Sequence, residues 1–310
     1  MKIPPSVSVL ALCFLSLLSA LGCVSCLTSA RAEEFYALGT AYFDLKKYDE
    51  AEKWFGKAKF HRRTRNASEY NLGRIAYEKN RYGDALRHFE WILGKDPKNV
   101  MALRAAAYAA IKNGDLEKAE TYYDQVLTLV PESYDEGYNY ALVLMALDKA
   151  PEAEAVLVKY KNAENADALY LLARAQKKQG KPEAADTFRA CLLKSSSPRI
   201  RFDYGEFLEE QGFYAKALNE YKRVLDDSSQ DKPDLSLVKF RVAAARLKGD
   251  SVSTEGIAAL REALTGGFKD QRAIDGLLAS TAVSEGKKTE IRKVLGELKP
   301  EEPEPGGSKK

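Results

Sequence analysis

The residues that could do chemistry are few in this 310-residue chain, and their spacing matches no catalytic or metal site. There are only two histidines, His61 and His88, and neither has a second ligand at a metal-binding spacing. The sequence contains no glycine-rich phosphate-binding loop, no G-x-S-x-G nucleophile turn and no H-E-x-x-H zinc motif. Scattered carboxylates on helical segments are typical of solvated surfaces. The sequence therefore predicts a binding protein without catalytic residue, metal or cofactor, rather than an enzyme.

Three of the four cysteines lie close to the N-terminus, and only Cys191 lies in the body of the chain. Cys23 and Cys26 have the C-x-x-C spacing of redox and metal sites, but they lie on no strand–helix unit and no second pair accompanies them. The spacing therefore favours a processed or lipidated leader over thiol chemistry. The body of the chain has no disulfide framework.

The first residues have the layout of a secretory signal peptide. Lys2 supplies one positive charge, and no other charge follows until Arg31, while an apolar stretch and then small residues lie between them. The segment Ala-Leu-Gly-Cys that ends at Cys23 resembles a bacterial lipobox, which implies lipidation of that cysteine and cleavage before it. The two alternatives are cleavage near Ala32, after an A-x-A pattern, and an uncleaved helix that spans the membrane. Each of the three places the body of the protein outside the cytoplasm.

Composition indicates a soluble, folded and helical body. The chain is 45% hydrophobic and 30% charged, and alanine, leucine, lysine and glutamate are abundant. The net charge of +3 gives no reason to expect nucleic acid as a partner. The chain is longer than one compact core usually needs. Residues 299–310 are rich in proline, glycine and charge, so we expect them to be disordered.

The body repeats itself with a period of 34 residues. An alanine recurs once in each period, and an aromatic residue or leucine follows it four positions later. The alanines are Ala51, Ala85, Ala119 and Ala153, and the large residues are Phe55, Phe89, Tyr123 and Leu157. The spacing then slips, and the next equivalents are Ala184 with Phe188 and Ala217 with Tyr221. A period of this length predicts stacked two-helix units.

The pattern resembles the tetratricopeptide repeat (TPR). The resemblance rests on Phe35-x2-Leu38-Gly39-x2-Tyr42, followed by Ala51-x3-Phe55. It implies an all-α fold, an α-solenoid in which helix pairs stack into a right-handed superhelix. After a leader at residues 1–31, six units are expected at residues 32–65, 66–99, 100–133, 134–164, 165–197 and 198–231. Residues 232–298 are expected to form degenerate helix pairs and a cap, with helices at residues 235–247, 254–264, 271–284 and 289–298.

The repeat suggests why small residues lie beside large rings. We expect Gly39 and Gly73, on the first helix of a unit, to let the paired helix approach closely. Ala51 and Ala85 do the same from the second helix, and rings such as Phe55 fill the space around the contact. A leucine at an alanine position would overpack the contact by roughly 1–3 kcal/mol.

The resemblance also implies a partner-binding groove, because the first helices of TPR units line a concave surface. The candidate groove residues are Tyr36, Tyr70, Arg74, Arg104, Tyr108, Tyr138, Tyr170 and Phe202. Aromatic rings with a few arginines suit the capture of a peptide or protein. The alternative is that the tyrosines simply pack against neighbouring first helices.

Charge along the candidate groove changes sign from one end to the other. The N-terminal half holds Arg74, Arg104 and Lys112, and the sixth unit holds Glu206, Glu209 and Glu210. Such a gradient would orient an extended ligand by its own charges. The alternative interpretation is an ordinary solvated helix face.

A basic segment, Lys57–Arg65, ends the second helix of the first unit. Its cations are best explained as complements to the negative end of that helix. The alternative is contact with lipid phosphates beside an anchor at Cys23.

These features predict a non-enzymatic TPR scaffold or adaptor in the bacterial cell envelope. It is expected to be exported and periplasm-facing, to be tethered to a membrane by a lipid anchor, and to bind a protein or peptide partner in its groove. The alternative function is that of an accessory ligand-binding component that pairs with a periplasmic binding protein of a transporter.

Overall fold

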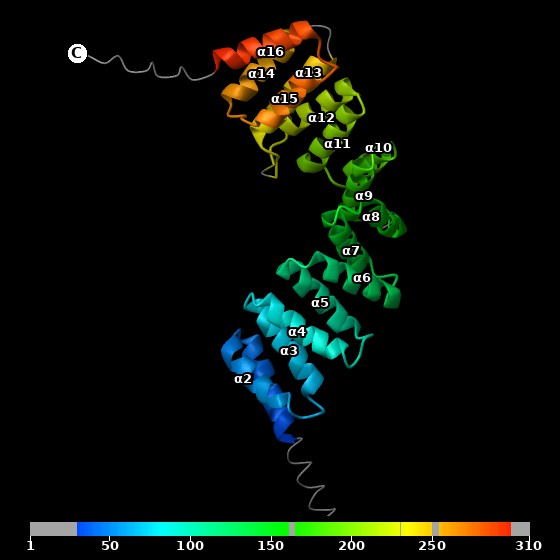
Figure 1. Cartoon of the computed structure of the whole chain (residues 1–310), viewed down its shortest axis with the longest axis vertical. Coiled ribbons are helices and arrows are strands. Elements are labelled where there is room, and N and C mark those ends of the chain that lie inside the picture. Colours follow the sequence, from blue (N-terminus) through cyan, green and yellow to red (C-terminus); the bar gives the residue numbers. More distant parts are fainter. Residues whose placement is uncertain (1–29, 161–164, 230, 250–253, 299–310) are drawn as a thin grey trace, which may run out of the picture. The chain divides into compact units, whose positions relative to one another are not determined.

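The computed structural model describes residues 30–160, 165–229, 231–249 and 254–298, and every regular element within these ranges is a helix (Figure 1). The predicted all-α fold is therefore confirmed. The predicted leader up to residue 29, with the lipidation candidate Cys23, and the predicted tail at residues 299–310 lie outside the described residues. Arg31 and Ala32, which were assigned to the leader or its cleavage site, lie in the first helix, at residues 30–44.

The chain forms two compact units, which divide between Lys149 and Ala150. This division falls inside the fourth predicted repeat, between its first and second helices. The boundaries proposed for the individual repeats remain predictions. Each unit is described by itself below.

The N-terminal unit consists of antiparallel helices in which each packs on the next along the chain. After the helix at residues 30–44, its elements are α2 (Tyr48–Ala58), α3 (Arg65–Glu78), α4 (Tyr82–Leu93), α5 (Val100–Asn113), α6 (Leu116–Leu129) and α7 (Tyr134–Ala146). Short turns join them. Gly114, in the turn after α5, has φ 83°, a left-handed conformation that glycine adopts without strain. Short turns of this kind make sequential helices antiparallel neighbours.

The C-terminal unit follows the same plan. Its elements are α8 (Ala150–Leu157), a 3₁₀ turn (Val158–Tyr160), α9 (Ala166–Lys178), α10 (Ala184–Lys194), α11 (Pro198–Glu210), α12 (Tyr214–Asp226), α13 (Leu235–Gly249), α14 (Thr254–Thr265), α15 (Gln271–Ala279) and α16 (Glu285–Glu297). The last two helices differ from the predicted ranges: α15 ends five residues earlier than predicted, and α16 begins four residues earlier. Ser280 and Ser284 have extended backbone conformations, which end one helix and start the next.

Glycines of the first helices make room for rings of the second helices. An added Cβ would lie 2.7 Å from the Phe55 ring at Gly39, 2.6 Å from the Phe89 ring at Gly73, and 2.6 Å from the Tyr221 ring at Gly205. These three rings are almost fully buried. The structure adds a detail to the expectation that rings fill the space around the glycines: the ring itself occupies the space that a side chain at the glycine would take.

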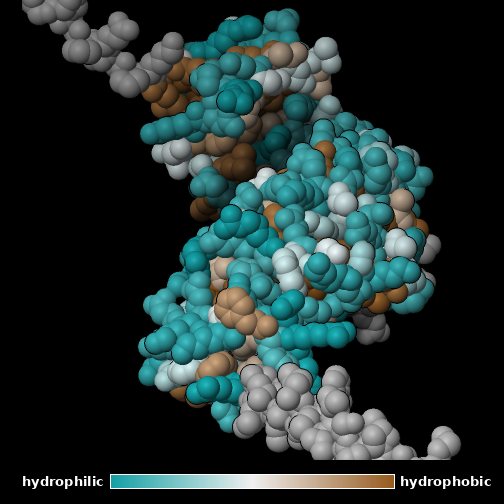
Figure 2. All heavy atoms as spheres, turned by 60° about the horizontal axis from the view of Figure 1, so that its bottom comes forward, coloured by the Kyte–Doolittle hydropathy of each residue, from teal (hydrophilic) through white to brown (hydrophobic). Residues whose placement is uncertain are grey.

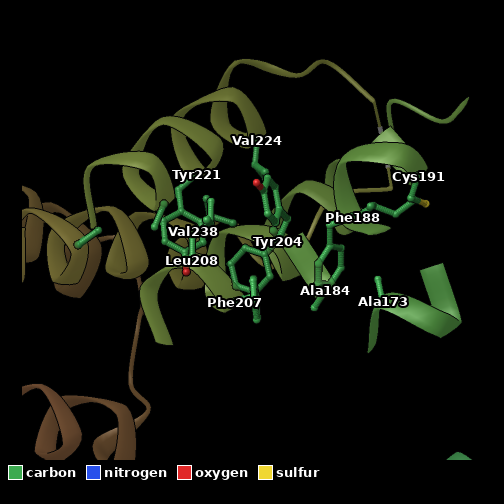
Figure 3. Packing of buried hydrophobic residues seen from close by; sticks show 14 of the residues in the cluster. Ala173, Ala184, Phe188, Cys191, Tyr204, Phe207, Leu208, Tyr221, Val224 and Val238 are labelled. Atoms are coloured by element: carbon green, nitrogen blue, oxygen red, sulfur yellow. The ribbon is translucent and has the colours of Figure 1, made fainter. Parts of the chain in front are cut away.

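Each unit has its own buried core. In the C-terminal unit one cluster joins α9 through α13, and Figure 3 shows Phe188 facing Tyr204 and Phe207. The ring centroids of Phe188 and Tyr204 lie 5.6 Å apart. The free thiol of Cys191 is buried in the same cluster. In the N-terminal unit the largest cluster joins α3 through α7.

The face shown in Figure 2 is predominantly hydrophilic, and apolar residues appear on it only in small groups. No helix among the described residues is long and apolar enough to cross a bilayer. In the same part of the chain, no three His, Cys, Asp or Glu side chains are grouped so that they could hold a metal ion.

Candidate functional site

Two adjacent cavities lie along the first helices of the N-terminal unit. One has a volume of about 380 Å³ and is lined by Tyr36, Asn66, Ala67, Tyr70, Asn71, Arg74, Ile92, Asn99 and Met101. The other has a volume of about 370 Å³ and is lined by Tyr70, Arg74, Tyr77, Glu78, Phe89, Arg104, Ala105 and Tyr108. Tyr70 and Arg74 belong to both. We call the surface made by the two cavities the N-terminal groove.

Five of the eight predicted groove residues line the N-terminal groove. They are Tyr36, Tyr70, Arg74, Arg104 and Tyr108. Two kinds of spacing bring them together. Residues four apart, such as Tyr70 and Arg74, share one face of a helix. Residues one repeat apart, such as Tyr70 and Arg104, occupy equivalent places on successive first helices.

Each groove tyrosine lies on the first helix of a repeat and is oriented by a ring on the second helix of that repeat. The Tyr36 ring centroid lies 5.4 Å from that of Phe55, and the Tyr70 centroid lies 5.5 Å from that of Phe89. Tyr108 makes an edge contact with Tyr123 at 6.2 Å. Each groove tyrosine thus packs on the large residue of the second helix in its own repeat. Because Tyr36 and Tyr70 are only half-buried and Tyr108 is 42% exposed, the rings keep surface for a partner.

Asparagines of the following repeat form hydrogen bonds to two of these tyrosine hydroxyls. Asn71 Nδ2 donates to the Tyr36 hydroxyl at 3.0 Å, and Asn139 Nδ2 donates to the Tyr108 hydroxyl at 2.8 Å. A ring that is packed at one edge and hydrogen-bonded at its tip loses little further freedom when a partner binds. The groove is therefore pre-organised.

Arg74 brings a positive charge to the groove without a carboxylate partner in the described part of the chain. Its guanidinium carbon lies 4.3 Å from the centre of the Phe43 ring, and its Nη1 donates to Asn71 Oδ1 at 3.1 Å. These contacts hold the side chain in place but leave its charge uncompensated. Arg74 is exposed, so its remaining N–H groups are available to a ligand.

Arg104 forms an ion pair with a buried glutamate, Glu136. Its Nε lies 2.6 Å from Glu136 Oε1, and the Glu136 side chain is only 7% exposed. Burial raises the pKa of Glu136 above its ordinary value, and the Arg104 guanidinium only partly offsets this effect. Because Glu136 engages one edge of the guanidinium, the other edge can face the groove. Glu78 lines the same cavity, so the arginine pair is not the only charge there.

The remaining predicted residues are not brought to this groove. Tyr138 stacks on Tyr134 in α7, with ring centroids 6.3 Å apart and planes at 10°. Tyr170, in the C-terminal unit, donates its hydroxyl to Asp203 at 2.5 Å, and burial together with this hydrogen bond raises the pKa of the phenol. Phe202 is only 6% exposed and packs on Tyr221. The structure therefore places Phe202 in the core, where it cannot serve as a groove surface.

The acidic end of the predicted charge gradient is neutralised. Glu206 Oε2 lies 3.0 Å from Lys177 Nζ, and Glu206 Oε1 lies 2.6 Å from Arg241 Nη2. Glu209 Oε1 lies 2.7 Å from Lys248 Nζ, and Glu210 Oε1 lies 3.5 Å from Lys177 Nζ. The three glutamates form ion pairs with cations of α9 and α13. The gradient interpretation is therefore wrong, because neighbouring helices supply the opposite charge.

Family comparison accounts for the repeated pairing of helices. A family model described as "Tetratricopeptide repeat" matches residues 70–134 and 170–233, and a second model of the same description matches residues 34–59. Together the matches cover half of the chain. The chain belongs to the tetratricopeptide repeat family. The matching models indicate no enzyme, and TPR proteins are generally non-catalytic scaffolds for protein–protein interaction.

Two relatives share part of the TPR region. An uncharacterized lipoprotein of Treponema pallidum (strain Nichols) is 27% identical over 134 residues, which are 43% of this chain and 68% of that protein. The TPR repeat-containing protein YpiA of Bacillus subtilis (strain 168) is 30% identical over 121 residues. That match covers 38% of this chain but only 29% of YpiA.

Solved TPR structures have a similar fold. A TPR protein from Parabacteroides merdae ATCC 43184 has a TM-score of 0.54 at 19% identity, with 79% of this chain and 97% of that chain covered. YrrB, described as a TPR protein with an unusual peptide-binding site, has a TM-score of 0.52 at 19% identity, with 59% and 95% covered. At these identities the likeness concerns the fold alone.

Several groove residues of this TPR protein had not been predicted. They are Asn66, Ala67, Asn71, Tyr77, Glu78, Ile92, Asn99, Met101 and Ala105. Helical spacing could have found Tyr77, which lies seven residues after Tyr70 and three after Arg74 on α3. Repeat spacing could have found Asn71, which lies one residue beyond the equivalent of Tyr36. Helical spacing could also have found Met101, which lies three residues before Arg104 on α5.

The basic segment after α2 combines helix capping with surface charge. Arg65 Nε donates to the Lys59 carbonyl oxygen at 3.1 Å, and Thr64 Oγ1 donates to the Ala58 carbonyl oxygen at 2.5 Å. These bonds satisfy carbonyl groups at the end of α2, as the helix-end explanation predicts. Lys59 also lies 3.4 Å from Glu69, and Arg63 lies 3.2 Å from Glu33.

Proposed function

We propose that the N-terminal groove binds an extended segment of a protein partner. The observation that carries this proposal is the pair of adjacent cavities, about 380 and 370 Å³ in volume, with pre-organised tyrosines and the guanidiniums of Arg74 and Arg104. Consecutive cavities of this size suit consecutive side chains of an extended peptide. Rings that are already fixed give contact area at low entropic cost. The peptide-binding site named for the structurally similar YrrB supports the same use of this fold.

The proposed role is that of a non-enzymatic scaffold in the bacterial cell envelope, tethered through a lipid on Cys23. The signal-peptide layout and the lipobox-like sequence support this location, and so does the lipoprotein relative of Treponema pallidum. Mass spectrometry of the mature protein tests the tether. A diacylated or triacylated Cys23 is expected, whereas an unmodified start at Glu33 would contradict it.

A photo-crosslinker in the groove tests the peptide-binding proposal in the cell. Ala105 lines the cavity between Tyr70 and Tyr108, so p-benzoylphenylalanine at this position should crosslink to the bound segment. Mass spectrometry of the crosslinked peptide then identifies the partner. A protein of an assembly or secretion complex would agree with a scaffold, whereas a periplasmic substrate-binding protein would favour the transport-accessory alternative.

Binding of the identified peptide then measures the contribution of the groove. We expect Arg74→Ala and Tyr108→Ala each to weaken binding by about tenfold or more, as truncation of central aromatic and arginine contacts usually does. Arg174→Ala is the matched control, because this arginine is also partly exposed and lies over a tyrosine ring, Tyr170, but belongs to the other unit. Unchanged affinity in folded Arg74 and Tyr108 variants would reject the groove.

A further inference from the structure

A third cavity lies at the end of the first helix pair, away from the groove tyrosines. It has a volume of about 300 Å³ and is lined by Arg31, Ala32, Phe35, Lys57, Phe60 and His61. The start of the first helix and the turn after α2 meet here (Figure 1), and Arg63 Nη1 lies 3.2 Å from Glu33 Oε1 across this junction. We call this surface the basic–aromatic end.

Phe60 is a large apolar side chain that is exposed to solvent. It is 78% exposed in the turn after α2, whereas Phe55, within α2, is fully buried. The Phe60 carbonyl oxygen accepts from Arg65 Nη2 at 3.4 Å, which holds the backbone of the turn in place. A phenyl ring that projects from a turn between cations is suited to an interface that is apolar on one side and charged on the other.

The cations around Phe60 are largely uncompensated. In the described part of the chain, Arg31, Lys57 and Arg62 have no carboxylate within ion-pair distance. Lys57 Nζ instead lies 4.3 Å from the centre of the Trp54 ring and 5.4 Å from that of Phe35. The acids that face this end are already engaged, because Glu33 pairs with Arg63 and Glu69 pairs with Lys59 and His88. Glu34 is the remaining acid near the start of the helix.

The proposed tether brings this same end close to a membrane. Six residues lie between Cys23 and Ala30, where the described chain begins. The seven residue-to-residue steps from Cys23 to Ala30 span at most about 25 Å when fully extended. A lipid on Cys23 would therefore keep Arg31 and Phe60 within reach of the bilayer surface, where each cation near anionic lipid contributes favourably.

We propose that the basic–aromatic end docks on anionic lipid headgroups. Phe60 enters the headgroup region, and Arg31, Lys57 and Arg62 contact lipid phosphates. This inference rests on the proposed lipid tether, but it adds a second, non-covalent contact that fixes which end of the N-terminal unit faces the membrane. Because two or three acyl chains on Cys23 would already anchor the protein stably, the basic surface contributes orientation rather than attachment.

A fluorescent reporter at position 60 tests the docking. The mature, lipidated protein carries the environment-sensitive amino acid Anap in place of Phe60 and is reconstituted into vesicles with brominated acyl chains. Phosphatidylcholine vesicles are compared with vesicles that also contain phosphatidylglycerol. We expect bromine quenching and a blue shift in the anionic vesicles, and reversal by added salt. Anap at Leu193, which is 90% exposed in the C-terminal unit, is the control and should stay aqueous.

Variants that remove one positive charge measure how much a single arginine contributes to docking. We expect Arg62→Gln to lower the ratio of docked to undocked protein about fivefold. Arg87→Gln is the matched control, because Arg87 is also exposed in the N-terminal unit but is paired with Asp84. Flotation of the vesicles reports the tether separately. Protein that floats while position 60 stays aqueous would overturn the docking and leave the tether intact, whereas protein that does not float would overturn both.

Discussion

At the scale of single residues, the contact between a glycine and a ring explains the unusual composition of the helices. Gly39, Gly73 and Gly205 each lie under a buried ring of the paired helix. Glycine inside a helix costs roughly 0.5–1 kcal/mol relative to alanine, because it loses more backbone freedom on folding. The ring that it accommodates offsets this cost, since burial of a large side chain stabilises the fold by roughly 1.5–3 kcal/mol.

Substitution of these glycines should therefore destabilise the protein in spite of helix propensity. In Gly73→Ala the new Cβ would lie 2.6 Å from Phe89 Cε1, so the buried ring must move. We expect a loss of roughly 1–3 kcal/mol, measured by chemical denaturation. Gly56→Ala on α2 is the matched control, because no neighbouring atom lies within 4 Å of its added Cβ, and it should stabilise the protein slightly.

A compensating change separates steric overlap from other causes. Leucine in place of Phe89 removes the ring edge that meets residue 73, so Gly73→Ala should cost less in the Phe89→Leu background than in the natural chain. Equal costs in both backgrounds would contradict the packing explanation.

At the scale of helices, ion pairs connect four of the second helices to the next repeat, either to the turn before its second helix or, for Lys118, to the first turn of that helix. Glu52 accepts from Arg81 at 2.9 Å, and Glu90 accepts from Lys118 at 3.0 Å. Further along the chain, the Glu120 carboxylate lies 2.7 Å from Lys149, and the Glu154 carboxylate lies 2.7 Å from Lys181. These partners are 27 to 29 residues apart in sequence. They fix the offset between neighbouring repeats as well as adding stability.

Removal of one such acid should change the response to pH. Burial alone would raise the pKa of Glu154, but hydrogen bonds from Lys181, Gln179 and Gln176 leave it below its ordinary value of 4.5. A lowered pKa in the folded state stabilises the fold above pH 4.5, and this contribution is lost as the pH falls through and below that value. Glu154→Gln should therefore be less stable than the natural chain at pH 7 and should differ less from it in acid.

Denaturation midpoints across this pH range provide the measurement. Glu152→Gln, on the exposed side of the same helix, removes a carboxylate that has no described ion pair and should leave the midpoint at pH 7 unchanged. If the Glu154 variant kept a constant difference from the natural chain at every pH, the ion-pair explanation would fail.

At the scale of the whole molecule, stability should be local. The chain divides into two compact units, and each contains a buried cluster of its own: one joins α3 through α7, and another joins α9 through α13. Stacked repeats contact mainly their neighbours, so a defect in one pair spreads over a limited distance.

Hydrogen exchange tests this locality. Gly73→Ala should speed amide exchange in α3 and α4 and leave α13 and α14 unchanged. Gly205→Ala in α11 is the reciprocal variant, since its Cβ would meet Tyr221 at 2.6 Å, and it should speed exchange in α11 and α12 without effect on α3. Uniform loss of protection along the chain in either variant would contradict local stability.

The sequence by itself determined the all-helical repeat fold and five of the residues that line the N-terminal groove. A period of 34 residues identifies equivalent positions, and a helical turn identifies which of them share a face, so Tyr70, Arg74, Arg104 and Tyr108 could be grouped without a structure. Both rules depend on local helix geometry, which holds wherever a helix forms.

Only the tertiary structure decided what each side chain meets across helices. It placed Phe202 in the core, paired Glu209 with Lys248, and seated the Phe89 ring over Gly73. These contacts depend on the offset and the angle between neighbouring helices, which change with the few side chains at each contact. A repeat period carries no information on either quantity, because it describes positions along one chain and not distances between packed surfaces.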